Sequence, residues 1–152
     1  MKYAIPVLIM IALFCAQQKN AQYHFDEGVK YLEKGEYDQA IAQYQKGLEL
    51  DPKSEVGYNL LGMACRMQYN KTGDVLWRHK EIISFNQALE VDPDYMPALV
   101  NLGATYYYSG EKKKATPYFK HALEVAPDHP EADEIRRMIE EGEAAVENDG
   151  NE

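Results

Sequence analysis

The sequence has very little cysteine. Cys15 and Cys65 are the two cysteines among its 152 residues, and Cys15 lies within an apolar segment at the N-terminus. If that segment is removed, Cys65 has no partner for an intramolecular disulfide, even in an oxidising compartment. We therefore expect the fold to be stabilised by side-chain packing alone.

Positive charge is also scarce. The chain has 16 Lys and Arg residues against 25 Asp and Glu, which gives a formal net charge of −9 and an isoelectric point near 4.9. Such a surface repels polyphosphate, so the composition argues against nucleic acid as a partner. Apolar residues make up 45% of the chain and charged residues 27%, which is typical of a folded globular domain.

The apolar run at the N-terminus is too short for a transmembrane helix. It extends from Ala4 to Ala16 after a start that carries Lys2, whereas a spanning helix needs roughly 20 residues. This outline is typical of a secretory signal peptide. We therefore expect residues 1–16 to be a signal peptide and the protein to be exported, either periplasmic or secreted. Two alternatives stay open: the leader is retained, or Cys15 is lipidated and anchors the protein to a membrane.

Catalytic motifs are missing from the sequence. It has no Gly-x-Ser-x-Gly, no phosphate-binding loop and no dinucleotide fingerprint. The histidines His24, His79, His121 and His129 show no metal-ligand spacing with one another or with Cys65. We predict no catalytic, cofactor-binding or metal-binding residues, no cofactor, and a protein that is not an enzyme.

An internal repeat is the strongest signal in the sequence, and three copies of it are visible. In the third copy, Leu99 lies three residues before Leu102 and four before Gly103, so these residues share one side of a helix. The glycine allows a partner helix to approach closely, and a proline stops the second helix. The matching positions are Gly28, Tyr31, Gly35, Ala40, Tyr44, Gly47, Leu48 and Pro52 in the first copy, and Gly103, Tyr106, Gly110, Ala115, Phe119, Ala122, Leu123 and Pro127 in the third.

With this pattern the chain resembles the tetratricopeptide repeat family, whose unit is a helix-turn-helix of about 34 residues. The resemblance implies an all-α fold: a right-handed superhelical stack of three helix pairs plus a C-terminal capping helix. The repeat domain covers residues 21–129, with repeats at about 21–54, 55–95 and 96–129. The amphipathic segment 130–147 is expected to be the capping helix, and residues 148–152 a disordered tail.

The middle copy departs from the repeat pattern, because it contains extra residues around Tyr69–Val75. Gly73 is expected to form a turn and Asp74 to cap the following helix, so that either helix of this pair is lengthened. Glu81 stands where the family usually has a small alanine. This predicts a looser or shifted packing of the middle pair.

In this family the first helices of the pairs line a concave groove that usually binds an extended peptide or a partner helix. The implied groove is apolar and aromatic, which suits a hydrophobic or amphipathic segment, and Met63, Met67, Tyr107 and Tyr108 are the principal candidate contacts. The alternative is that some of these side chains are buried against the capping helix. The groove positions are Phe25, Val29 and Leu32, then Asn59, Met63, Arg66 and Met67, and finally Val100, Ala104, Tyr107 and Tyr108.

Family members that bind acidic chaperone tails hold the terminal carboxylate with Lys, Arg and Asn on successive first helices, and that set is missing here. Only Asn101 is compatible with it, and Arg66 would be a lone cation.

These observations predict a non-catalytic adaptor or scaffold that binds a peptide or helix of a partner protein in the cell envelope or after secretion. The alternative is a self-associating structural component of a membrane-anchored lipoprotein complex. The sequence does not define the oligomeric state.

Overall fold

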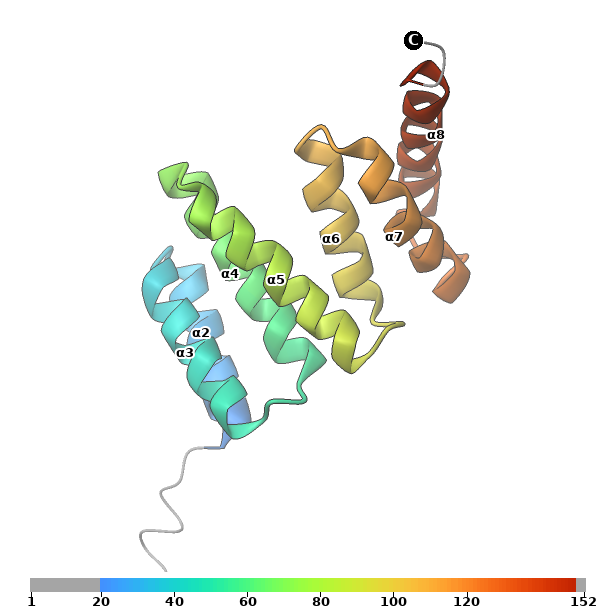
Figure 1. Cartoon of the computed structure of the whole chain (residues 1–152). Helices are drawn as coiled ribbons and strands as arrows, with labels where there is room; N and C mark the ends of the chain where they lie inside the picture. The colour runs from blue at the N-terminus through green and yellow to red at the C-terminus, as the bar shows by residue number, and fades with distance from the viewer. Residues whose placement is uncertain (1–19, 150–152) are drawn as a thin grey trace, which may run out of the picture.

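The computed structural model describes residues 20–149, which form seven α-helices and no strand. The helices follow one another as antiparallel neighbours, and each packs against the next along the chain (Figure 1). Three pairs are closed by a single last helix. The signal peptide expected at residues 1–16 and most of the expected tail lie outside the described residues. The helices are α2 (Ala21–Glu33), α3 (Tyr37–Leu50), α4 (Glu55–Thr72), α5 (Val75–Val91), α6 (Met96–Tyr108), α7 (Lys112–Val125) and α8 (Ala132–Asp149).

Each pair is held together by an aromatic ring that packs on a glycine of the facing helix. A Cβ atom on Gly62 would lie 2.5 Å from Phe85 Cε1, and one on Gly103 would lie 2.6 Å from Phe119 Cε1. Tyr44 covers Gly28 in the same way. The three rings are fully or almost fully buried. The repeat therefore places a glycine opposite each aromatic ring, and the missing side chain of the glycine leaves the space that the ring fills.

The middle pair contains the extra residues in both of its helices. α4 has 18 residues and α5 has 17, whereas α2 and α6 have 13 and α3 and α7 have 14. Gly73 ends α4 in the left-handed conformation at φ 70°, which favours glycine. Asp74 then caps α5, since its Oδ1 accepts a hydrogen bond from Leu76 N at 3.0 Å. The predicted turn and cap are both confirmed.

The capping helix α8 covers the end of the stack. Its residues Ala132, Ile135 and Met138 are buried, and Ile135 and Met138 form one cluster with Phe119 of α7. Gly142 lies against Thr116, so that α8 approaches the N-terminal part of α7 closely. The helix continues to Asp149, two residues beyond the expected boundary. An amphipathic helix in this place shields the apolar side of the last pair from water.

Candidate partner-binding surface

The groove positions of α2 lie mostly within the first apolar cluster. Phe25 is 5% exposed, and its ring fills the space beside Gly47 and Gly57. Val29 and Leu32 are half-buried and pack against the same cluster. Phe25 therefore acts as a core residue that joins the first pair to α4, and it offers almost no surface to a partner.

The groove positions of α4 divide into two kinds. Met63 and Met67 are half-buried and keep part of their flexible side chains accessible. Asn59 is buried, and its side-chain amide links α4 to α6. Its Nδ2 donates to Met63 Sδ at 3.6 Å, while its Oδ1 accepts from Asn101 Nδ2 at 3.0 Å. Arg66 belongs to a charged network that continues from this amide pair.

Tyr107 and Tyr108 differ in their surroundings, although they are adjacent on α6. The Tyr107 hydroxyl donates to Glu141 Oε2 of α8 at 2.5 Å, and Lys112 Nζ lies 2.6 Å from the same oxygen. Hydrogen bonds from Lys112 and Tyr107 lower the pKa of Glu141 to about 2. Tyr107 is thus held by the capping helix, as the alternative interpretation of the sequence allowed. Tyr108 is 72% exposed.

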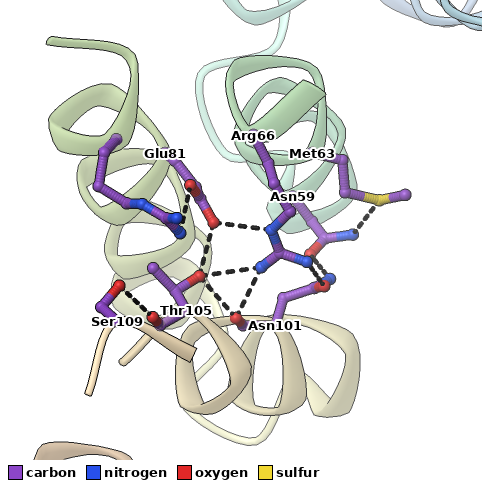
Figure 2. A network of polar contacts seen from close by, with 8 residues as sticks. Asn59, Met63, Arg66, Glu81, Asn101, Thr105 and Ser109 are labelled. Atoms are coloured by element: carbon purple, nitrogen blue, oxygen red, sulfur yellow. Dashed lines mark hydrogen bonds and ion pairs between the residues drawn. The ribbon is translucent and has the colours of Figure 1, made fainter. Parts of the chain in front are cut away.

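A network of polar contacts joins α4, α5 and α6 around the carboxylate of Glu81 (Figure 2). Arg66 Nε lies 2.7 Å from Glu81 Oε1, and Thr105 Oγ1 donates to the same oxygen at 2.6 Å. The remaining nitrogens of Arg66 reach α6: Nη1 donates to Asn101 Oδ1 at 2.9 Å and Nη2 donates to Asn101 O at 2.8 Å. The lone cation expected in the groove is therefore a structural group that bridges three helices.

Glu81 is completely buried, and its carboxylate also pairs with a second arginine. Arg78, one turn earlier on α5, places Nη1 3.2 Å from Glu81 Oε2, and its guanidinium lies 4.2 Å from the centre of the Tyr69 ring. The prediction of loose packing at this position is wrong. A carboxylate at the usual alanine position is retained because two arginines and one hydroxyl satisfy its oxygens.

Two pockets adjoin Tyr108 and Ala104, and together we call them the α4–α6 surface. The first, the Arg78 pocket, has a volume of about 320 Å³. The second, the Met138 pocket, has a volume of about 200 Å³ and lies toward the capping helix. The Arg78 pocket is lined by Arg66, Asn70, Arg78, Ala104, Thr105 and Tyr108, and the Met138 pocket by Val100, Ala104, Tyr108, Phe119, Glu131, Glu134, Ile135 and Met138.

Several of these lining residues were missed by sequence reasoning. Asn70 and Arg78 belong to the lengthened pair α4 and α5. The extra residues there interrupt the repeat pattern, so it does not predict which side of the helix each residue occupies. One signal was available: a glutamate at a position that must be buried requires a cation nearby, and Arg78 stands three residues before it on the same helix. Ala104 and Tyr108, two of the predicted groove positions on α6, line both pockets.

Two further kinds of candidate site would be a metal-ligand cluster or a reactive thiol among the described residues. No group of three or more His, Cys, Asp and Glu suited to a metal ion occurs among them. Burial raises the pKa of the Cys65 thiol to about 12, which keeps it protonated and unreactive. No helix within residues 20–149 is long and apolar enough to cross a membrane.

Comparison with known families matches two parts of the chain. The family model described as "TPR repeat" matches residues 28–65, and the one described as "Tetratricopeptide repeat" matches residues 97–129. The chain contains tetratricopeptide repeats. The seven helices of the described residues, each packed on the next, confirm the expected all-α stack of three helix pairs with a capping helix.

Similar proteins have varied roles. Photosystem I assembly protein Ycf3 of Rippkaea orientalis is 28% identical over 141 residues, which cover 80% of this chain and 77% of that protein. A probable UDP-N-acetylglucosamine–peptide N-acetylglucosaminyltransferase SPINDLY of tomato, Solanum lycopersicum, is 28% identical over 106 residues, but the chain spans only 11% of its length. Proteins similar to this chain thus include an assembly protein and a much longer protein named as a probable transferase.

Among solved structures, the first tetratricopeptide domain of Spaghetti (RPAP3) bound to the HSP90 peptide SRMEEVD is 26% identical to this chain. The match has a TM-score of 0.66 and covers 78% of this chain and 90% of that domain. A scaffold of this size is therefore sufficient to hold a short peptide in that protein. Here Asn101, the one residue compatible with a carboxylate clamp, is engaged by Arg66 and Asn59.

Proposed function

We propose that this protein is a non-catalytic adaptor that captures a peptide or helix of a partner protein on the α4–α6 surface. The observation that carries the proposal is Tyr108, an aromatic side chain that is 72% exposed on a rigid helix between two pockets. Exposed aromatic anchors next to pockets are typical of interaction hot spots. The peptide held by the similar RPAP3 domain supports the same mode of binding.

We include Met63 and Met67 of α4 in the proposed binding surface, although neither lines one of the two pockets. Both side chains are half-buried. Their accessible, flexible thioethers can adapt to an apolar ligand. Tyr107 contributes in a different way from the one expected, because its hydroxyl is committed to Glu141. By this contact Tyr107 ties the end of α6, which bears Tyr108, to the capping helix.

Affinity measurements test this proposal. The protein would be panned against a displayed library of random twelve-residue peptides, and the dissociation constant of the best synthetic peptide would then be measured by calorimetry. Tyr108→Ala combined with Met63→Ala should weaken binding about tenfold or more, since a buried aromatic anchor commonly contributes 2 kcal/mol or above.

Ile83→Ala is the matched control for these variants, because Ile83 is 54% exposed on α5 and lines a different pocket with Ile41 of α3. It should leave affinity unchanged. Equal affinities of the wild type and the Tyr108 and Met63 double variant, with both folded, would refute the assignment of this surface.

We further propose that the adaptor acts in the cell envelope or outside the cell after removal of residues 1–16. The support is the sequence alone: a basic start, a short apolar run and a polar continuation. The intact mass of the protein from its native host, measured in membrane and soluble fractions, tests this. A full-length mass in the soluble fraction would contradict export.

Self-association is the second candidate function, favoured by a different observation. Val75 and Leu76 at the tip of the long hairpin are 67% and 62% exposed, and Ile83 lies on the same helix. Apolar side chains gathered in this way can join two copies. Light scattering of the wild type and of Leu76→Glu tests this candidate: a dimer that dissociates in the variant supports it, and a monomeric wild type excludes it.

A further inference from the structure

We propose that the Arg78 pocket binds a carboxylate of the captured peptide, with Arg78 as the residue that contacts it. This inference rests on the proposed function and specifies the chemistry of the partner. It contrasts with the overall charge of −9, which by itself favours basic or neutral partners.

The pocket has an excess of positive charge. Two guanidinium groups, those of Arg66 and Arg78, line it, and Glu81 is the single carboxylate that both contact. Both oxygens of Glu81 are already occupied, because Oε1 accepts from Arg66 and Thr105 and Oε2 accepts from Arg78. The other lining residues are uncharged. One net positive charge therefore faces the pocket.

The two arginines differ in the donors that they have left. Arg66 uses Nε, Nη1 and Nη2 in hydrogen bonds to Glu81, Asn101 and Thr105. Among the described residues, only Glu81 accepts a hydrogen bond from Arg78, and that bond uses a single nitrogen. Because a guanidinium has five N–H donors in a planar fork, Arg78 can still present a pair of them to a carboxylate. Arg66 supplies charge, and Arg78 supplies the contact.

The geometry holds Arg78 ready for this contact. Its guanidinium is stacked 4.2 Å from the centre of the Tyr69 ring, while 23% of its side chain stays exposed. A stacked and partly paired guanidinium loses less conformational entropy on binding than a free one. Asn70 and Tyr108 line the same pocket and carry neutral polar groups.

The acidic net charge does not prevent this binding. Exposed carboxylates further away than about 8 Å are largely screened at physiological ionic strength. The nearest pocket on the other side of Tyr108 is different, since it is lined by Glu131 and Glu134 together with Ile135 and Met138. A bound peptide is therefore oriented, with its acidic group at Arg78 and an apolar side chain toward the capping helix.

Nuclear magnetic resonance with three small probes tests the pocket directly. The probes are N-acetyl-glutamate amide, which has a side-chain carboxylate, N-acetyl-glutamine, which has a terminal carboxylate, and N-acetyl-glutamine amide, which has neither. Each is titrated at constant ionic strength while the Arg78 Nε–H signal is followed. We expect a saturable shift with at least one carboxylate probe, and the probe that binds distinguishes a side chain from a peptide terminus.

The pocket proposal fails if the Arg78 signal is unmoved by both carboxylate probes or moves equally with the neutral amide. Arg78→Gln should abolish the response as seen at neighbouring Asn70, whereas Arg78→Lys, which keeps the charge next to Glu81, should retain a weaker one. Arg136→Gln, which removes an exposed arginine of α8, is the matched control and should change nothing.

Selected peptides separate this inference from the proposed function. Replacing the acidic residue of a bound peptide by its amide should weaken affinity for the wild type about tenfold or more, and the same replacement should have little effect on Arg78→Gln. If peptides bind without any dependence on an acidic group, the carboxylate inference is refuted and peptide capture stands. If the small probes shift Arg78 and no peptide binds, the pocket stands and peptide capture is refuted.

Discussion

The two junctions between successive helix pairs differ in their principal contacts. Between the first and second pairs, Phe25 and Leu48 close over Gly57 in an apolar cluster. A hydrogen bond from Gln68 to Asp38 also crosses this junction. Between the second and third pairs, Arg66 and Glu81 reach Thr105 and Asn101 of α6 through charged and polar contacts. The same stacking of repeats is thus achieved by burial of apolar area at one junction and by a closed polar network at the other.

Each junction is sensitive to a different kind of substitution. An apolar junction depends on volume, so it is sensitive to added or removed methyl groups. A buried ionic junction is stable only while each buried charge keeps its partners, because the loss of a partner leaves charge in the interior that is not fully compensated. The polar junction also leaves spare donors at the surface, and this property connects it with partner binding.

The largest expected effect is at the polar junction. Arg66→Ala should lower the free energy of unfolding by about 3–5 kcal/mol, since Glu81 is completely buried and keeps only Arg78 and Thr105. The double variant Arg66→Met with Glu81→Ala removes the buried carboxylate together with Arg66 and leaves Arg78, which is 23% exposed, without its partner, so it should regain part of this loss. Urea unfolding measures both values. A loss below about 1 kcal/mol for Arg66→Ala would show that the network is not a structural element.

The apolar junction should respond to overpacking. A Cβ on Gly57 would lie 2.6 Å from Phe25 Cζ and 2.9 Å from Leu48 Cδ2, so Gly57→Ala should cost about 1–3 kcal/mol despite the better helix propensity of alanine. The neighbouring Val56→Ala, at an exposed position, should stay within about 0.5 kcal/mol of the wild type. A stabilised Gly57→Ala protein would contradict this packing.

The hairpin that carries the polar junction should be sensitive to its cap. Asp74→Ala removes the acceptor for Leu76 N and should cost about 1 kcal/mol, whereas Asp74→Ser keeps an acceptor and should cost less. Thermal unfolding followed by circular dichroism compares the two variants. Equal losses in both would assign the effect to something other than the cap.

The contact between α6 and the capping helix should depend on pH. The pKa of Glu141 is lowered from 4.5 to about 2 by Lys112 and Tyr107, so its stabilising contribution is present above pH 4.5 and is lost as the pH falls toward 2. We expect Glu141→Gln to lower Tm slightly at pH 7. The difference from the wild type should disappear toward pH 2.

Glu140→Gln on the same helix is the control for that experiment, because Glu140 is exposed. A Tm difference between Glu141→Gln and the wild type that stays constant from pH 7 to pH 2 would contradict the assigned contact.

Much of the fold could be predicted from the sequence because its determinants are local and repeated. Gly62 with Phe85 and Gly103 with Phe119 are spaced by the geometry of a helix pair, and this geometry recurs in each copy. The turn at Gly73 and the cap at Asp74 follow from backbone chemistry alone. Such features do not depend on which distant residues they meet.

The candidate site was less predictable because it depends on contacts between repeats. Phe25 occupies a groove position in the family register, yet the glycines at 47 and 57 create a space that its ring fills. Tyr107 donates its hydroxyl hydrogen bond to Glu141, which lies on the capping helix outside the repeats. The role of Glu81 required knowing that Arg66 and Arg78 converge on it from two helices.

Mapping a bound peptide on the protein tests the central claim most directly. The chain, labelled at the methyl groups of Met, Ile and Leu, would be titrated with a display-selected peptide and followed by nuclear magnetic resonance. If the α4–α6 surface captures the partner, the methyl signal of Met138, which lines the Met138 pocket, shifts together with those of Met63 and Met67. The signals of Leu76 and Ile83 do not shift. Shifts confined to Leu76 and Ile83 would contradict the claim and place the partner on the long hairpin instead.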